Sequence, residues 1–286
     1  MYTVRIKNIR DEEITLTDQQ TRYQVIKITG LNPPKAQINT SAGANIDGAI
    51  FNSARLNTRN IVLTVVINGE VEENRQNLYR FFQTKNLCTF YFANQNRDVF
   101  IEGYVDNIEC DLFQKHERMQ ISIICPQPYF KAVDEIVNDM SSVTGTFVFP
   151  FAIDYDDPVP FSEYETLRTT DVFNASDSST GIIIEASFRE SVSDLVIQNI
   201  DTGEAFSLSY SFLAGDSVII NTNQGHKSVT LIRGGVSSNI FAAVQVGSTF
   251  FQLAIGSNNF GYLADNGDKN NSVSVVIRHN TLFRGV

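Results

Sequence analysis

Short apolar or alternating runs, each closed by glycine, proline, asparagine or aspartate, follow one another along nearly the whole chain. Ile61–Ile67 is almost continuously apolar and rich in β-branched residues, and Asn68-Gly69 supplies a turn directly after it. Such runs favour short strands, because β-branched side chains pack well on a pleated surface and turn residues interrupt helices. The sequence therefore predicts an all-β fold, in which Ile61–Ile67 is a strand covered on both faces.

One segment departs from the strand pattern and predicts the only convincing helix. After Asn68-Gly69, apolar residues recur at helical spacing at Val71, Leu78 and Phe81-Phe82, and acidic residues occupy the first turn. Acidic side chains at the start of a helix complement its dipole. We expect this helix to end at Asn86 and to lie across a sheet edge or a barrel mouth.

The length of 286 residues predicts two domains, because a single hydrophobic core rarely keeps growing in so long a chain. Cys125–Lys131 contains two prolines, which cannot donate to a sheet ladder, so it ends a strand. We place the boundary just after it, giving domains 1–132 and 133–286. Turn signals such as Asp201-Thr202-Gly203 and Ala214-Gly215-Asp216 recur in the second domain with the spacing of a β-sandwich.

Charge and hydropathy exclude several function classes. A formal net charge of -10 argues against general DNA binding, which relies on dense lysine and arginine contacts, although a local basic patch stays open. No apolar run approaches the roughly 20 residues of a membrane-spanning helix. Met1–Asn8 alternates like a strand and lacks the apolar stretch of a secretory signal. We expect a protein that is made in a cytoplasm and does not enter a membrane.

The sequence offers no cofactor site, metal site or catalytic constellation. Its cysteines lack CxxC spacing and predict small buried hydrophobes, and its histidines lie in separate contexts that favour surface or turn positions. No GxSxG elbow or phosphate-binding loop occurs, so we expect the protein not to be an enzyme. The residues concerned are Cys88, Cys110, Cys125, His116, His226 and His279.

Two acidic segments are candidates for a calcium-binding loop or for a pair of glycosidase carboxylates. Asp154–Pro158 groups carboxylates, but its proline breaks an EF-hand register and the required glycine and glutamate are missing, which favours a solvated interdomain loop. Asp265–Asp268 is explained by a plain hairpin turn.

The order of several segments resembles one family over nearly the whole chain. In the first half these are Gly30–Pro34, the Gly43–Gly48 loop, Asn57–Asn60, Leu78–Phe82 and Cys125–Phe130; in the second half they are Ile197–Asn199, Gly215–Thr222 and Phe283–Val286. In this order and spacing the chain resembles the distal tail protein family, often called Dit, of siphophages that infect Gram-positive bacteria.

The resemblance implies an N-terminal tail-tube-like split β-barrel with one helix and a C-terminal galectin-like β-sandwich. It further implies a homo-hexameric ring around the DNA channel, through which DNA passes without specific binding. Such a ring is a hub of the virion that joins the tail tube protein to the tail-associated tip protein, which is tail-lysin-like, and in some members carries receptor-binding proteins.

A long loop in such proteins wraps the neighbouring subunit, and the matching segment here is Leu31–Arg59. Its centre, Thr40–Gly48, is small, polar and glycine-rich, so it buries little surface alone and becomes ordered only against a partner. The residues that we assign to this subunit interface are Leu31, Asn32, Pro33, Pro34, Gly43, Asn45, Ile46, Asp47, Gly48, Asn57 and Arg59.

A structural hub is the leading hypothesis, and two others are kept. A carbohydrate-binding adhesin would use the C-terminal sandwich, but galectin-type sites commonly stack a sugar on tryptophan and this chain has Trp 0. Thr249–Leu253 stands where relatives often carry that tryptophan, and its alternating aromatics favour sandwich core. A cell-wall or capsule hydrolase rests only on scattered carboxylates such as Asp156 and Asp157.

Overall fold

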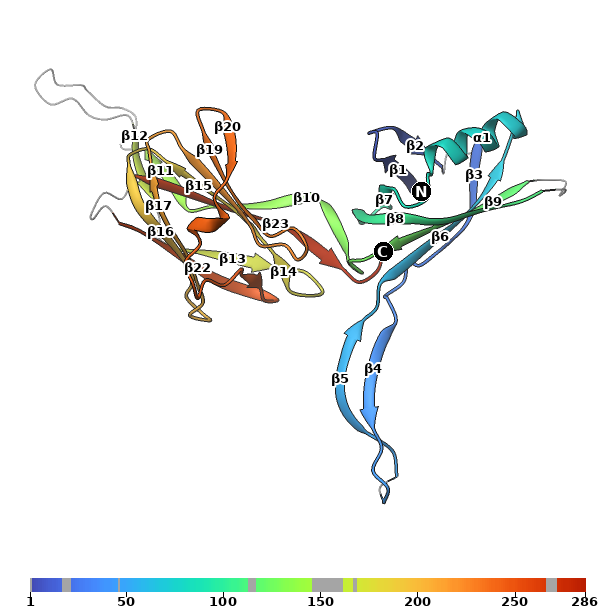
Figure 1. Cartoon of the computed structure of the whole chain (residues 1–286), viewed down its shortest axis with the longest axis horizontal. Helices are drawn as coiled ribbons and strands as arrows, with labels where there is room; N and C mark the ends of the chain where they lie inside the picture. The colour runs from blue at the N-terminus through green and yellow to red at the C-terminus, as the bar shows by residue number, and fades with distance from the viewer. Residues whose placement is uncertain are drawn as a thin grey trace, which may run out of the picture. The chain divides into compact units, whose positions relative to one another are not determined.

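The chain divides into two compact units (Figure 1). Each unit has its own hydrophobic core. The computed structural model describes residues 2–16, 22–45, 47–112, 117–145, 162–166, 169–265 and 272–286, and the side chains of 141–145, 162–166 and 265 are not described. Unit 1 comprises Met1–Asp134 and Leu282–Val286, and unit 2 comprises Glu135–Thr281. The chain therefore passes between the units twice, within β10 (Phe130–Asp139) and within β23 (Val273–Phe283).

Unit 1 is built from antiparallel strands and one helix. Its strand β8 pairs with β7 through its first half and with β9 through its second, and the register shifts between Val105 and Asn107. This gives the two strand orders β2-β1-β7-β8-β10 and β3-β6-β9-β8. The elements are β1 (Thr3–Asn8), β2 (Glu13–Thr15), β3 (Tyr23–Thr29), β4 (Ala36–Ser41), β5 (Ile50–Leu56), β6 (Arg59–Ile67), α1 (Val71–Phe81), β7 (Leu87–Ala93), β8 (Asp98–Asp111) and β9 (Arg118–Cys125).

The core of unit 1 collects the alternate residues of these strands. Ile61, Leu63 and Val65 of β6 are fully buried, whereas the residues between them are only partly covered. The prediction that this strand is covered on both faces is therefore wrong for the isolated chain. β6 is a strand with one buried face and one partly covered face. Its sequence is almost continuously apolar because valine and threonine are tolerated on a half-exposed sheet face.

Helix α1 ends earlier than predicted, at Phe81 instead of Asn86. Phe82 leaves the helical conformation and buries its ring in the core. The Lys85 N–H then donates to the Val105 carbonyl of β8, so the chain has already turned towards the sheet. A tertiary contact thus overrides the local stop at Asn86.

Unit 2 is a β-sandwich whose two sheets share one core. The orders are β13-β22-β16-β17 in one sheet and β23-β15-β18-β19-β20 in the other. The rings of Phe188 and Phe212 stack between them at 4.1 Å. The elements are β11 (Ser141–Gly145), β12 (Ser162–Thr166), β13 (Thr169–Asn174), β14 (Thr180–Gly181), β15 (Ile183–Phe188), β16 (Val192–Asn199), β17 (Ala205–Phe212), β18 (Ser217–Asn221), β19 (Ser228–Arg233), β20 (Val236–Asn239), η1 (Phe241–Ala243), β21 (Gln252–Leu253) and β22 (Gly256–Asp265).

The architecture confirms the predicted fold class, mainly β with α1 as the α-helix of the described residues. Phe251 and Leu253 lie in the sandwich core. Cys88 and Cys125 are buried, and Cys110 is only half-buried.

His226 lies exposed in a turn, but the surface position expected for His279 is wrong. Its side chain points inward because it occupies an inward-facing position of β23, and strand alternation sets the face whatever the residue type. His116, Asp154–Pro158 and Asn266–Asp268 lie outside the described residues.

Candidate assembly arm and its base

The hairpin formed by β4 and β5 is the most unusual feature of unit 1. The two strands form a separate sheet of their own, and Figure 1 shows the hairpin extending away from the other strands of its unit. Nearly every residue in both strands is exposed. A lone two-stranded hairpin is only marginally stable in water.

The arm has an apolar face and a polar face. On the first face Ile38 lies opposite Ala54, and beyond a register shift Thr40 lies opposite Phe51. Ile38 and Phe51 are each 62% exposed, which leaves two large apolar residues in water on this face of the ribbon.

The polar face is held together by its own side chains. Arg55 donates from Nε and Nη2 to Gln37 Oε1, at 3.0 and 2.9 Å, and Asn39 Nδ2 donates to Ser53 Oγ at 3.0 Å. These exposed side-chain hydrogen bonds add to the backbone pairing of the two strands. The same face also carries Ile50, which lies opposite Ser41 and is 58% exposed.

At the base of the arm, Arg59 is almost completely buried, with 3% of its surface exposed. Its guanidinium donates to the carbonyls of Gly30, Asn32 (2.7 Å), Pro128 (2.8 Å) and Arg284 (2.6 Å). It also lies 4.5 Å from the centre of the Phe130 ring. Burial lowers the pKa of this arginine, because the charge has left water.

Glycine is required where the chain enters the arm. Gly30 has φ +87°, and a side chain there would collide with the carbonyl of Asn60. Only glycine combines that backbone conformation with so close an approach of two strands. Gly30 thereby brings its carbonyl within reach of Arg59.

The predicted interface residues fall into two groups. One group surrounds the base of the arm, and the other lies in the loop at its tip, where Ile46 is outside the described residues. The base group is Leu31, Asn32, Pro33, Pro34, Asn57 and Arg59, and the described tip group is Gly43, Asn45, Asp47 and Gly48. Of these, Arg59 is buried against its own chain. Sequence reasoning missed its partners Pro128 and Arg284, because no local pattern links them to it.

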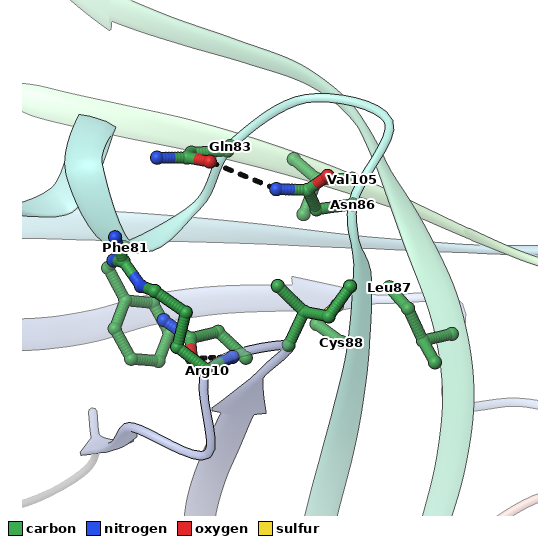
Figure 2. A pocket seen from close by; sticks show the side chains of 9 residues that line it. Arg10, Phe81, Gln83, Asn86, Leu87, Cys88 and Val105 are labelled. Carbon is green, nitrogen blue, oxygen red and sulfur yellow. Dashed lines mark hydrogen bonds between the residues drawn. The ribbon is translucent and has the colours of Figure 1, made fainter.

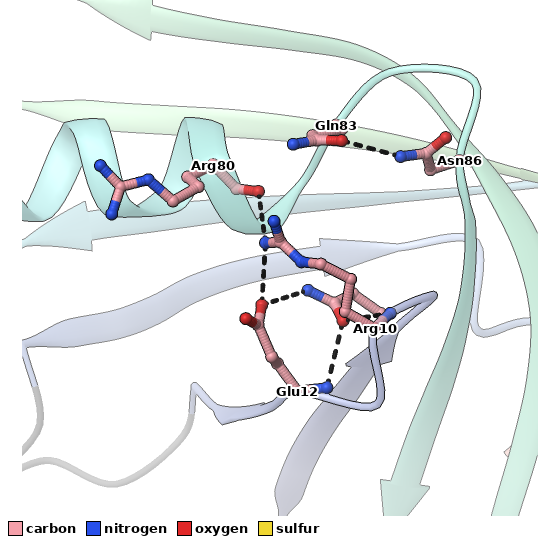
Figure 3. A network of polar contacts seen from close by, with 6 residues as sticks. Arg10, Glu12, Arg80, Gln83 and Asn86 are labelled. Atoms are coloured by element: carbon pink, nitrogen blue, oxygen red, sulfur yellow. Dashed lines mark hydrogen bonds and ion pairs between the residues drawn. The ribbon is translucent and has the colours of Figure 1, made fainter.

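A small pocket lies between the β1–β2 turn, the end of α1 and the start of β7 (Figure 2). Its volume is about 10 Å³, which is room for one water molecule at most. Beside it, Arg10 donates to Glu12 Oε2 at 2.9 Å and to the Arg80 carbonyl at 3.0 Å, and Asn8 also donates to Glu12 (Figure 3). These polar groups bind one another and fasten the turn to the helix end.

Among the described residues, no group of three or more His, Cys, Asp or Glu side chains is placed to hold a metal ion. No helix among those residues is long and apolar enough to cross a membrane.

Two family models match the chain. The phage tail protein RIFT-related domain matches residues 7–125, and the C-terminal domain of the siphovirus-type tail component matches residues 175–280. A search of curated proteins found no match.

Solved structures align over almost the full length. The crystal structure of the SPP1 Dit protein, described as a paradigm of the hub adsorption apparatus in Gram-positive infecting phages, has 14% identity and a TM-score of 0.69, covering 98% of this chain and 99% of that one. The phage P2 baseplate in its activated conformation with Ca has 12% identity and a TM-score of 0.56, covering 98% of both chains. A strontium form of the p2 baseplate has 10% identity and a TM-score of 0.56, again covering 98% of both.

The two family models fall on the two units in turn, and the SPP1 Dit fold spans both. The chain therefore belongs to the distal tail protein (Dit) family of siphophages, and is a structural component of the phage tail and not an enzyme.

Proposed function

We propose that this chain forms a homo-hexameric ring at the tip of the tail, with unit 1 as the tail-tube-like, ring-forming domain and unit 2 as a galectin-like domain at the periphery. The ring joins the tail tube protein to the tail-associated tip protein and carries receptor-binding proteins. DNA passes through it without specific binding, and the chain is made in the cytoplasm of the host.

The arm is the observation that carries this proposal. A ring of identical subunits needs a head-to-tail contact, in which one surface of each subunit docks on a different surface of the next. An amphipathic hairpin with exposed Ile38 and Phe51 provides the first of these surfaces. Because a large stable interface depends on apolar area and shape, such an arm suits assembly better than catalysis.

The assembly role is tested by replacing Thr40–Asp47 with a short Gly-Ser linker. The variant should keep the fold of the subunit, since the arm contributes almost nothing to either core, and should lose ring formation. Native mass spectrometry and negative-stain imaging, with the tail partners present, would report both. Unchanged rings would contradict the role of the arm.

The position in the particle needs a separate experiment. A reconstruction of assembled tails should place six copies between the tube and the tip. Finding the chain in the shaft repeat, in a fibre or outside the particle would overturn the hub assignment.

Glycan binding by unit 2 is the second candidate function. Phe173 of β13 is 59% exposed, and on the same strand Asp171 accepts a hydrogen bond from Ser257. An exposed ring near carboxylate and hydroxyl groups is the kind of surface on which sugars stack. A glycan array that gives no signal with the whole protein would remove this candidate.

A further inference from the structure

Arg59 joins three segments that are far apart in the sequence. Its acceptors Gly30 and Asn32 precede the arm, Pro128 lies just before the chain leaves unit 1, and Arg284 lies just after it returns. All four are neutral backbone carbonyls. The charge is therefore stabilised only while each of these segments stays in place.

The returning segment, Phe283–Val286, is held by further contacts at the same place. Arg97 donates to the Gly285 carbonyl at 2.6 Å, and its guanidinium lies 4.3 Å from the centre of the Phe283 ring. The Val286 N–H donates to the Leu31 carbonyl at 3.2 Å. Phe283–Val286 thus lies directly on the residues from which the arm begins.

Arginine is the residue type that this junction requires. Its planar guanidinium carries five N–H donors in a fixed arrangement, so it can serve several carbonyls and stack on Phe130 at once. A lysine has the same charge but presents a single ammonium centre, which cannot span these acceptors.

We propose that Arg59 and Phe283–Val286 form a clamp that holds the base of the arm in one orientation, with Arg59 as its positioning residue. The direction in which the arm leaves unit 1 is thereby fixed by the segment of chain that returns from unit 2. The benefit to ring closure rests on the proposed function, because a hairpin that leaves the subunit in one fixed direction loses less conformational entropy on docking. The clamp itself is a property of the single subunit.

Hydrogen–deuterium exchange of the full chain, at a dilution where it is monomeric, tests the clamp. Three variants are compared with the wild type: Arg59→Lys, deletion of Phe283–Val286, and the control Arg55→Lys, which makes the same substitution on the same hairpin outside the clamp. The readout is exchange in peptides covering 30–35 and 57–60, with helix α1 as the internal reference.

Arg59→Lys and the deletion should each speed exchange at the base at least about tenfold, because hydrogen bonds to a buried charge are lost. Exchange in α1 should stay unchanged, and Arg55→Lys should leave both regions as in the wild type. Combining the two clamp changes should add little to either one, since they act on the same contacts.

Unchanged exchange at the base would overturn the clamp. So would an equal rise in α1, because Arg59 would then support the whole unit instead of the arm. If Arg59→Lys does not fold, the deletion variant decides, since it keeps Arg59 and removes one of its acceptors. If the wild-type protein forms no rings, the proposed function is contradicted. The exchange measurement on the monomer still tests the clamp in that case.

Discussion

Arg233 holds the carboxylate of Asp216 through two nitrogens, with Nε donating to Oδ1 at 2.9 Å and Nη2 donating to Oδ2 at 2.6 Å. The Asp216 side chain is only 2% exposed, and it also accepts a hydrogen bond from the Leu213 N–H. The pair therefore fastens the turn before β18 to the end of β19.

This pair predicts an acid-sensitive step in unit 2. The hydrogen bond from Arg233 lowers the pKa of Asp216, so its stabilising effect is present above the ordinary pKa of an aspartate and is lost as the pH falls through the lower folded-state pKa. Asp216→Asn should destabilise unit 2 at neutral pH and flatten its stability profile below about pH 4. Urea unfolding across pH measures both. A variant profile parallel to the wild type would exclude the pair as the cause.

His279 predicts a second acid-sensitive step at higher pH. Burial lowers its pKa, and the Phe173 backbone acts in the opposite direction with smaller effect. The unfolded chain binds a proton near pH 6.5 while the folded chain does not, so stability is lost as the pH falls below about 6.5 and on towards the folded pKa. His279→Leu should remove this loss. The check is the free energy of unfolding of unit 2 between pH 7.5 and 5 for both proteins.

A comparison of Gly30 with Gly48 distinguishes the energetic cost of backbone strain from the cost of a steric collision. Both have positive φ, but a side chain at Gly48 would meet no neighbouring atom, whereas one at Gly30 would strike the Asn60 carbonyl. Gly48→Ala should cost about 1 to 2 kcal/mol from backbone strain alone, and Gly30→Ala should cost more than about 3 kcal/mol in unit 1. Thermal unfolding of the two variants compares them directly. Equal losses would mean that the strands at Gly30 can move apart.

The two faces of the arm should respond differently to a charge. Ile38→Asp places a carboxylate on the apolar face, and Asn39→Asp places one at the adjacent residue, which lies on the polar face. Because Ile38 is exposed in the subunit, its replacement should change the unfolding free energy by less than about 0.5 kcal/mol. Self-assembly should be lost in Ile38→Asp and retained in Asn39→Asp, as measured by native mass spectrometry. Loss in both would show that the polar face also docks.

The cysteines should differ in reactivity. Burial raises the pKa of Cys88 and of Cys125 to about 12, and also raises that of the half-buried Cys110. Thiolate is the reactive form, so a thiol reagent at about pH 8 should modify Cys110 slowly and leave the other two intact. Counting labelled sites by mass before and after unfolding tests this. The native Cys110→Ser variant should take up no label. Rapid labelling of this variant would show that the core around Cys88 and Cys125 opens.

Much of the fold could be predicted from sequence because its causes are local. A β-branched run such as Ile61–Ile67 and the turn pair that follows it act within a few residues, and so do the acidic residues that begin α1. The small polar residues of Thr40–Gly48 likewise predict a loop with little core of its own, and the residues on either side of it, Ala36–Asn39 and Ala49–Arg55, predict strands. The sequence could not show that β4 and β5 pair with each other as a ribbon with two different faces, because that depends on the pairing register.

The burial of Arg59 and of His279, and the early end of α1, were decided only by tertiary structure. The hydrogen bond from Arg59 to Arg284 joins residues 225 positions apart, and nothing in the neighbourhood of either residue encodes it. Local sequence determines which conformation a segment favours, since backbone propensity and side-chain alternation act over a few residues. Which charge becomes buried, and what satisfies it, depends on the contacts that form when distant segments meet, because the cost of burying a charge is offset only by partners that folding itself brings together.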